Sequence, residues 1–309
     1  MREIFVNLKR FDVPKSLGGI CPLDNPKEWI EWVVDESVKH GLGKLEDIRL
    51  TYLLPEALLI PAMEKLASYP AEETSNLHIG CQGVFRENVM PGGNFGAFTT
   101  NLPAAAAKNM GCSWSIIAHS EERKDKLGII GAFEPAYNED EALRKKAMTA
   151  LNNLINQEVL CALDAGLDVL LCVGETAEER GGGTFEEQKP RIEAVLKAQL
   201  EAGLKGVENK LGDRKIVIGY EPIWAIGPGK IPPDGEYIGF VSSYIKSVVR
   251  EMYDKDIIVV YGGGLKEENA GMISNIETIG GGLVALTKFT QPIAFEPEGL
   301  AKIIQKYVE

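Results

Sequence analysis

Short apolar runs rich in β-branched residues alternate along this chain with longer segments whose apolar residues recur at helical spacing. Eight runs have the strand pattern, and they are apolar enough to be covered on both faces of a sheet. They are residues 4–7, 48–53, 77–82, 114–118, 168–173, 215–220, 257–261 and 282–286. The helical pattern lies between them, at residues 26–39, 55–68, 139–165, 185–211, 235–253 and 298–308.

This alternation of strand and helix predicts a parallel sheet with crossover helices. Eight such units close naturally into a (β/α)8 barrel, which we expect to form one domain over residues 1–309. The alternative is an open doubly wound sheet. It is disfavoured because no Gly-x-Gly-x-x-Gly motif follows the first strand and no linker divides the chain.

Two connections are longer than a barrel needs. Residues 11–25 extend the first βα loop, and residues 122–138 extend the fourth. Both follow strand ends on the face where such barrels bind ligands, so each either shapes the pocket or is solvated decoration.

Composition is that of an ordinary enzyme with an acidic balance. The 309 residues are 45% hydrophobic and 25% charged, with 33 Lys and Arg against 45 Asp and Glu and a net charge of −12. No basic stretch alternates with aromatic residues, so nucleic acid and anionic membranes are not expected partners. An anionic substrate would have to be attracted by local groups.

The expected compartment is the cytoplasm. The first seven residues begin a strand instead of a basic region followed by an apolar one, and no apolar run reaches membrane-spanning length. The five cysteines are widely spaced and form no Cys-x-x-Cys motif. We therefore expect reduced core thiols, with neither a disulfide nor a metal site.

Polar groups stand at the carboxyl ends of several predicted strands. Asn7 and Lys9 follow the first, the run His119, Ser120 and Glu121 follows the fourth, and Glu221 follows the sixth. Taken singly, each has an ordinary structural explanation: His119 as a core histidine, Lys9 as a surface cation, Glu221 as a turn-capping carboxylate. Together they form an acid–base set, with a carboxylate base, an imidazole that polarises a carbonyl and an ammonium beside developing charge.

The segment after Glu221 is typical of a lid over such a site. Pro222 ends the strand because it has no N–H to donate, and Ile226 and Gly227 supply an apolar tip and a flexible joint. Competing motifs are incomplete, including the P-loop, the zinc motif His-Glu-x-x-His and the nucleophile elbow. The pattern therefore favours proton-transfer chemistry without a cofactor or metal.

With these pieces in order, the chain resembles the triosephosphate isomerase family over nearly its full length. The matching pieces are residues 7–9, 96–99, 118–121, 172–175, 220–227 and 261–263. The resemblance implies a TIM barrel, a sugar phosphate substrate and a place in glycolysis and gluconeogenesis. It also implies that Glu221 abstracts a proton, that His119 shuttles a proton between two oxygens, and that Lys9 and Asn7 stabilise the enediolate. Ser120 and Glu121 would support the site.

The resemblance breaks where the family binds phosphate. Gly263 and Gly264 follow the seventh strand, and the family has Ser where this chain has Gly264. Ala285 and Leu286 replace a Gly-Gly pair after the eighth strand, so the Leu286 side chain competes with phosphate for space. Lys288 is either a compensating cation or a solvated one.

Two further departures lie elsewhere. Pro228 replaces a Thr in the lid, and Glu122 replaces an Arg, which alters a supporting ion pair. The leading expectation is an aldose–ketose isomerase acting on triose phosphates. One alternative is the same chemistry on another sugar phosphate, such as a tetrose phosphate, and another is a non-catalytic binding barrel.

We also expect a homodimer. Residues 90–101 resemble the family's protruding third loop, and Phe98 within it would be exposed in a monomer.

Overall fold

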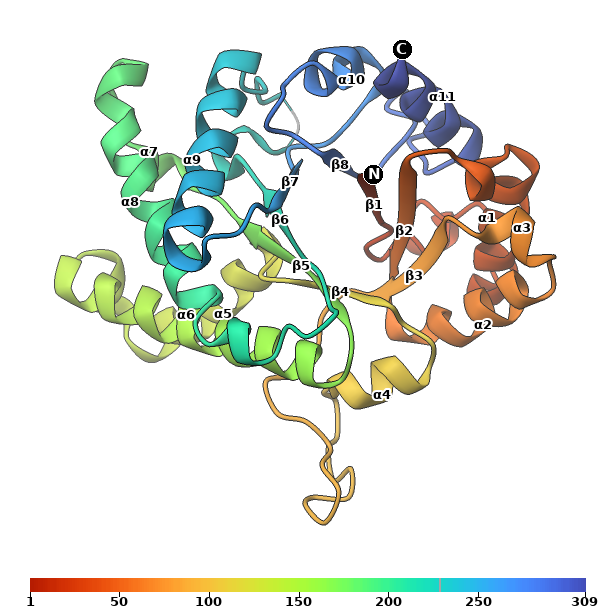
Figure 1. The fold of residues 1–309 in the computed structure, drawn as a ribbon, viewed down its shortest axis with the longest axis horizontal. Helices are drawn as coiled ribbons and strands as arrows, with labels where there is room; N and C mark the ends of the chain where they lie inside the picture. The colour runs from red at the N-terminus through yellow and green to blue at the C-terminus, as the bar shows by residue number, and fades with distance from the viewer. Residues whose placement is uncertain (228) are drawn as a thin grey trace.

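The computed structural model describes residues 1–227 and 229–309, and its centre is a closed barrel of parallel strands (Figure 1). The strands are paired in sequence order, and the last pairs with the first. They are β1 (Arg2–Asn7), β2 (Ile48–Leu54), β3 (Leu77–Cys81), β4 (Trp114–Ile117), β5 (Asp168–Val173), β6 (Ile216–Tyr220), β7 (Ile258–Tyr261) and β8 (Gly281–Val284). The predicted barrel is confirmed, and the open-sheet alternative is excluded.

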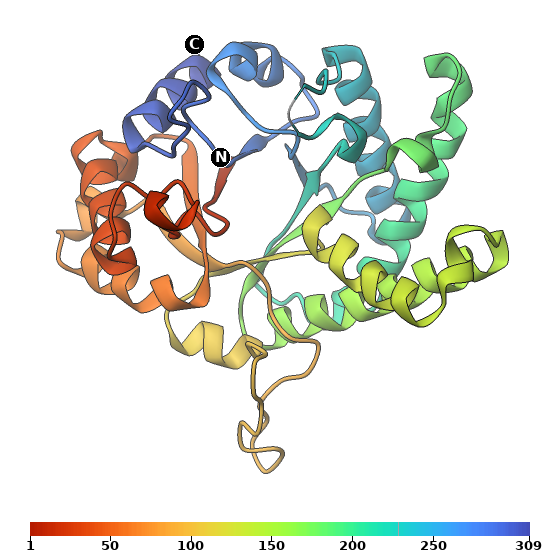
Figure 2. The ribbon, with the colours of Figure 1, turned by 180° about the vertical axis from the view of Figure 1, so that it is seen from behind.

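Helices surround the barrel on its outside (Figures 1 and 2). They are α1 (Pro26–Lys39), α2 (Glu56–Ala67), α3 (Ala71–Thr74), α4 (Ala104–Asn109), α5 (Ser120–Phe133), α6 (Glu141–Asp164), α7 (Ala177–Arg180), α8 (Phe185–Gly203), α9 (Gly235–Tyr253), α10 (Glu267–Ser274) and α11 (Pro297–Val308). Local signals set several boundaries. The side chain of Asn25 caps α1, and Pro26 occupies its first turn, where a missing N–H costs nothing.

Two cores follow from the alternation of side chains along the strands. Phe5, Trp114 and Leu170 point into the barrel, where the rings of Phe5 and Trp114 meet edge to face with centroids 5.0 Å apart. Neighbouring residues such as Ile4 and Val6 instead pack against the surrounding helices. Full burial of one such side chain stabilises the fold by about 1.5–3 kcal/mol. The core inside the barrel and the core between strands and helices together hold the strand ends in fixed relative positions.

The fourth connection is long, as expected, but most of it is not a loop. Residues 122–133 belong to α5, followed by the short 3-10 helix η3 (Pro135–Asn138). The sequence pattern missed α5 because Gly128 and Gly131 lower its helix propensity and its apolar residues do not gather on one face; Phe133 is 89% exposed.

Helix α8 is shorter than expected and ends at Gly203 instead of continuing to residue 211. The chain turns at Gly206, whose φ of +77° is unfavourable for residues with a side chain. The connection between β3 and α4 projects away from the barrel in both views (Figures 1 and 2). No helix in the described part of the chain is long and apolar enough to cross a membrane.

Candidate active site

Three ionisable side chains meet at the carboxyl-terminal mouth of the barrel. Lys9 lies two residues beyond β1, His119 two residues beyond β4, and Glu221 directly after β6. The carboxyl ends of parallel barrel strands share one face, so residues more than 100 positions apart become neighbours. Lys9 adopts a φ of +43°, in the left-handed region that is unusual for a residue with a side chain.

Glu221 is almost fully buried and is held by the start of α5. The backbone N–H of Ser120 donates to Oε2 of Glu221 at 2.9 Å, and the Ser120 hydroxyl donates to Oε1 at 3.0 Å. The same Oε1 lies 3.3 Å from Nε2 of His119. A carboxylate at a helix amino terminus is stabilised by the exposed N–H groups and the helix dipole.

The hydrogen bonding of His119 selects its neutral tautomer. Its Nδ1 atom accepts a hydrogen bond from the backbone N–H of Glu121 at 3.3 Å, which requires an unprotonated Nδ1. The ring proton therefore sits on Nε2, the nitrogen nearest Glu221. A neutral imidazole with its N–H directed into the mouth can donate a hydrogen bond to a carbonyl oxygen and return the proton later.

Lys9 is paired with Glu121 across the mouth. Its ammonium group donates to Oε1 of Glu121 at 2.7 Å. Partial burial opposes ionisation of Glu121, but the hydrogen bond and positive charge of Lys9 outweigh it and lower the pKa of Glu121. The pair fixes the lysine ammonium beside the site, because Glu121 stays ionised.

Asn7 orders the backbone on which Lys9 stands. Its side-chain oxygen accepts the N–H of Lys9 at 3.0 Å and an N–H of the Gln82 amide at 3.1 Å. The Gln82 amide also donates to the carbonyl oxygens of Lys9 at 3.0 Å and Leu53 at 3.2 Å. Sequence reasoning assigned no role to Gln82, although its position just after β3 was a usable signal.

A buried glutamate anchors the base of the segment after Glu221. Oε1 of Glu175 accepts hydrogen bonds from Trp224 Nε1 at 2.8 Å, from the Tyr237 hydroxyl at 2.7 Å and from the Tyr220 hydroxyl at 3.0 Å. Burial raises the pKa of Glu175 despite these donors. Only the fold brings Tyr237, from α9, to this group, and the sequence analysis did not identify it.

The two predicted lid residues lie just beyond this anchor. Ile226 follows the 3-10 helix η5 (Ile223–Ala225), and its side chain is 38% exposed. Gly227 has a φ of +122°, a conformation that side chains disfavour. The proline at position 228 that departs from the family lies outside the described residues.

Gly263 and Gly264 bring the chain close to the mouth after β7. A Cβ atom on Gly263 would lie 2.2 Å from the Tyr261 hydroxyl oxygen, so only glycine fits there. Gly264 has a φ of +94°. The backbone N–H groups of Gly264, Ala285 and Leu286 donate no hydrogen bond to any residue that the structure describes. Such N–H groups are available to an anion.

The segment after β8 uses Lys288 in a different way. Lys288 exchanges backbone hydrogen bonds with Ala294, at 3.0 and 3.1 Å, and its ammonium lies 3.7 Å from Oε1 of Glu296. Leu286 keeps its side chain half-buried beside this turn. Lys288 therefore has a carboxylate partner within the protein and is not directed at the mouth by any contact.

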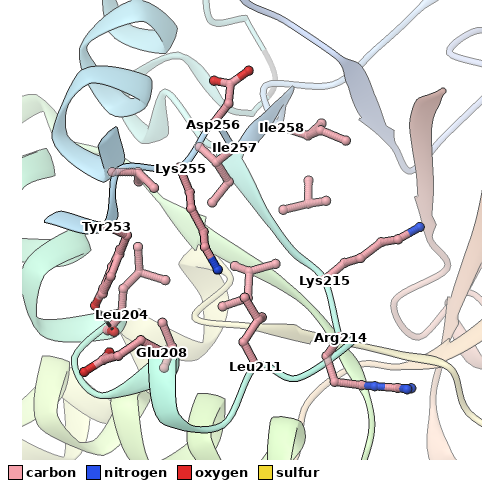
Figure 3. Close-up of a pocket in the computed structure, with 14 residues that line it drawn as sticks. Leu204, Glu208, Leu211, Arg214, Lys215, Tyr253, Lys255, Asp256, Ile257 and Ile258 are labelled. Atoms are coloured by element: carbon pink, nitrogen blue, oxygen red, sulfur yellow. Dashed lines mark hydrogen bonds between the residues drawn. The ribbon is translucent and has the colours of Figure 1, made fainter. Parts of the chain in front are cut away.

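Two cavities accompany these features. One, of about 850 Å³, borders the mouth through Ser120, Glu121 and Ile226, and its outer wall comes from α5 and α6. The other, of about 310 Å³, lies at the opposite end of the barrel, where residues leading into β6 and β7 meet the end of α9 (Figure 3). It contains none of the strand-end groups, so it is separate from the candidate active site.

Comparison with known proteins gives a consistent result. A sequence model described as triosephosphate isomerase matches residues 36–305. A triosephosphate isomerase of Lawsonia intracellularis is 32% identical over 84% of this chain and 85% of its own length. One from Oleidesulfovibrio alaskensis is 30% identical over 74% of this chain and 79% of its own length. A triosephosphate isomerase structure from Bartonella henselae covers the full chain with a TM-score of 0.66 at 23% identity, which supports the fold.

Proposed function

Because the chain belongs to the triosephosphate isomerase family, we propose that it interconverts glyceraldehyde 3-phosphate and dihydroxyacetone phosphate through an enediolate. The resemblance read from the sequence is thus confirmed, and the enzyme class is an aldose–ketose isomerase, an intramolecular oxidoreductase. The observation that carries the proposal is the convergence of Lys9, His119 and Glu221 at one barrel mouth.

In the proposed reaction, Glu221 removes the proton from the carbon beside the carbonyl, and His119 donates its Nε2 proton to the carbonyl oxygen. The neighbouring hydroxyl then returns a proton to His119, and Glu221 delivers its proton to the adjacent carbon. Lys9 stabilises the negative charge on the enediolate oxygens. Two electrons move from one carbon to the next within the substrate, so the reaction balances without an external oxidant.

Glu221 must leave Ser120 before it acts, because its two oxygens are both engaged there. We assign this movement to substrate binding and to closure of the lid carried by Ile226 and Gly227. Closure would exclude water and strengthen every electrostatic contact in the site. The Glu175 anchor at Trp224 supports a hinge at the base of the lid.

The residues where the family binds phosphate favour a second candidate function, which is the same isomerisation of a different sugar phosphate. The backbone N–H groups of Gly264, Ala285 and Leu286, which donate to no described residue, suit an oxyanion, but Leu286 carries a side chain where the family has glycine. Lys288 is a weak replacement because Glu296 is its neighbour. A substrate such as a tetrose phosphate would place its phosphate differently at this mouth.

A turnover screen of triose, tetrose and pentose phosphates tests both candidates. The proposal expects the highest kcat/KM on a triose phosphate, with turnover lost in Glu221→Gln. A higher kcat/KM on a tetrose phosphate would favour the second candidate. If the purified protein turns over none of these compounds, the proposed function is wrong and a non-catalytic barrel becomes the better account.

The same proposal includes a cytoplasmic homodimer. All five cysteines are free thiols, which suits a reducing compartment. The projecting connection after β3 carries Phe95 at 89% exposure and Met90 at 64%, an apolar surface that a partner would cover. The residue expected to be exposed, Phe98, is instead partly covered by Phe85, with ring centroids 5.6 Å apart.

A further inference from the structure

The residue before His119 has an unusual backbone that two adjacent side chains hold in place. Ala118 is fully buried with a φ of +65°, a conformation that is costly for a residue with a Cβ atom. Its N–H donates to Oε2 of Glu122 at 2.6 Å, and its carbonyl oxygen accepts from Nε of Arg123 at 3.1 Å. Both polar groups of this peptide segment are therefore fixed by the first turn of α5.

Glu122 is held in turn by a partly buried chain of charged groups, in which only Glu158 is fully buried. The ammonium of Lys126 donates to Oε1 of Glu122 and, at 2.7 Å, to Oε1 of Glu158 on α6. Burial and the neighbouring Glu122 carboxylate raise the pKa of Glu158 to about 8. Burial opposes ionisation of Glu122, but its hydrogen bond with Glu158 and the charge of Lys126 lower its pKa. At neutral pH the cluster thus contains one carboxylate, one ammonium and one neutral acid.

Arg123, which follows Glu122, is paired with groups on α6 and β5. The Arg123 guanidinium also donates to Asn152 on α6 at 3.0 Å and to the carbonyl oxygen of Cys172 on β5 at 3.1 Å. The Arg123 charge acts on Glu122 and Glu221, and the Cys161 thiol on α6 faces Glu158. Burial raises the pKa of the Cys161 thiol and of the Cys172 thiol, so neither adds a negative charge beside the cluster.

We propose that Glu122, braced by Lys126 and Glu158, is a positioning residue that holds the backbone N–H of Ala118, the residue before His119, and thereby aims the imidazole at the substrate. The direction of the His119 Cα–Cβ bond depends on the backbone that Glu122 restrains. The inference rests on the proposed isomerase function. It concerns this chain in particular, since the resembling family has Arg where Glu122 stands.

Three single variants test the role of Glu122. Glu122→Ala removes the acceptor for the Ala118 N–H and should lower kcat at least about tenfold, with KM within about twofold, because small misplacements of a catalytic group are costly. Glu122→Gln keeps an oxygen for that N–H and should restore kcat to within about threefold of the parent. Asp125→Asn removes an exposed charge from the same helix and should change neither constant.

A spectroscopic readout separates positioning from simple stabilisation. The imidazole ¹⁵N signals of His119, recorded without substrate, should shift in Glu122→Ala and return toward the parent values in Glu122→Gln. Unchanged kcat and unchanged His119 signals in a folded Glu122→Ala protein would overturn the inference. Loss of melting temperature alone would also overturn it, because a merely structural role predicts that result.

A second variant covers the case in which Glu122→Ala does not fold. Lys126→Met removes the ammonium that binds Glu122 and Glu158 but leaves the Glu122 carboxylate. We expect kcat to fall and the His119 signals to shift, each by less than in Glu122→Ala. A folded Lys126→Met protein with parental values of both would overturn the inference. Inactivity of the parent on every sugar phosphate would instead refute the proposed function, while the His119 signals would still test the positioning.

Discussion

Ser120 binds both oxygens of the Glu221 carboxylate, through its N–H at 2.9 Å and its hydroxyl at 3.0 Å. The proposed base therefore lies at the amino terminus of α5, 3.3 Å from the imidazole of His119. Burying an unpaired carboxylate costs free energy. The two hydrogen bonds from Ser120 offset that cost in the absence of substrate.

Replacing the base should abolish most of the activity without unfolding the protein. Glu221→Gln keeps the shape and one acceptor for Ser120 but cannot accept a carbon-bound proton, so we expect kcat to fall at least about 100-fold. Steady-state kinetics and thermal melting measure the two effects. Glu178→Gln, an exposed carboxylate on α7, is the matched control and should retain parental turnover. Near-normal turnover by Glu221→Gln would rule out its assigned role.

The loop after β8 should limit the use of triose phosphate. Leu286→Gly removes the side chain that we expect to compete with the phosphate, and one added hydrogen bond to a charged group contributes about 1.5–3 kcal/mol. We therefore expect kcat/KM on glyceraldehyde 3-phosphate to rise about tenfold or more. Lys288→Ala should change it less than about threefold, because Lys288 faces Glu296. A large loss in Lys288→Ala would show that this lysine binds the anion after all.

The projecting connection after β3 should mediate self-association. The Phe95 side chain is 89% exposed in the isolated protomer, so Phe95→Asp should leave the fold intact. The new charge should weaken the dimer. Sedimentation at micromolar concentration should show a dimer for the parent and a shift toward monomer for the variant. Phe133→Asp, equally exposed on α5, is the control. A monomeric parent protein would contradict the prediction.

Glu158 should make stability depend on pH in a definite direction. Its folded-state pKa of about 8 exceeds the ordinary value of 4.5, so the folded protein keeps a proton that the unfolded chain releases. The free energy of unfolding should therefore fall as pH rises from about 4.5 to about 8, by up to about 1.4 kcal/mol per pH unit from this group.

Glu158→Gln mimics the protonated acid and should lack that component. Urea denaturation of both proteins between pH 5 and pH 9 gives the difference in unfolding free energy, in which groups common to both cancel. The variant should gain stability relative to the parent as pH rises, and the gain should level off above about pH 8. A difference that stays constant across this range would contradict the raised pKa.

Local sequence patterns were enough to predict the barrel and the residues that stand at its carboxyl-terminal mouth. Residues 168–173 and 26–39 form a strand and a helix with the predicted bounds, because β-branched density, an Asn cap and a first-turn proline act over a few residues. Glu221 before Pro222 marks a strand end for the same kind of reason. Once eight parallel strands are expected, their carboxyl ends must share one face, so the meeting of Lys9, His119 and Glu221 follows from order alone.

The tertiary structure decided which partners these groups have. Three hydrogen bonds join residues of separate elements: Gln82 to Lys9, Tyr237 to Glu175 and Lys126 to Glu158. These contacts form only when the barrel closes and the helices pack. Helix α5 escaped notice because its apolar side chains do not form one buried face. It is held instead by buried Arg123, which donates to Asn152, and by one ion pair to α6. Hydrogen bonds between distant residues depend on distances and angles that periodicity along the chain does not encode.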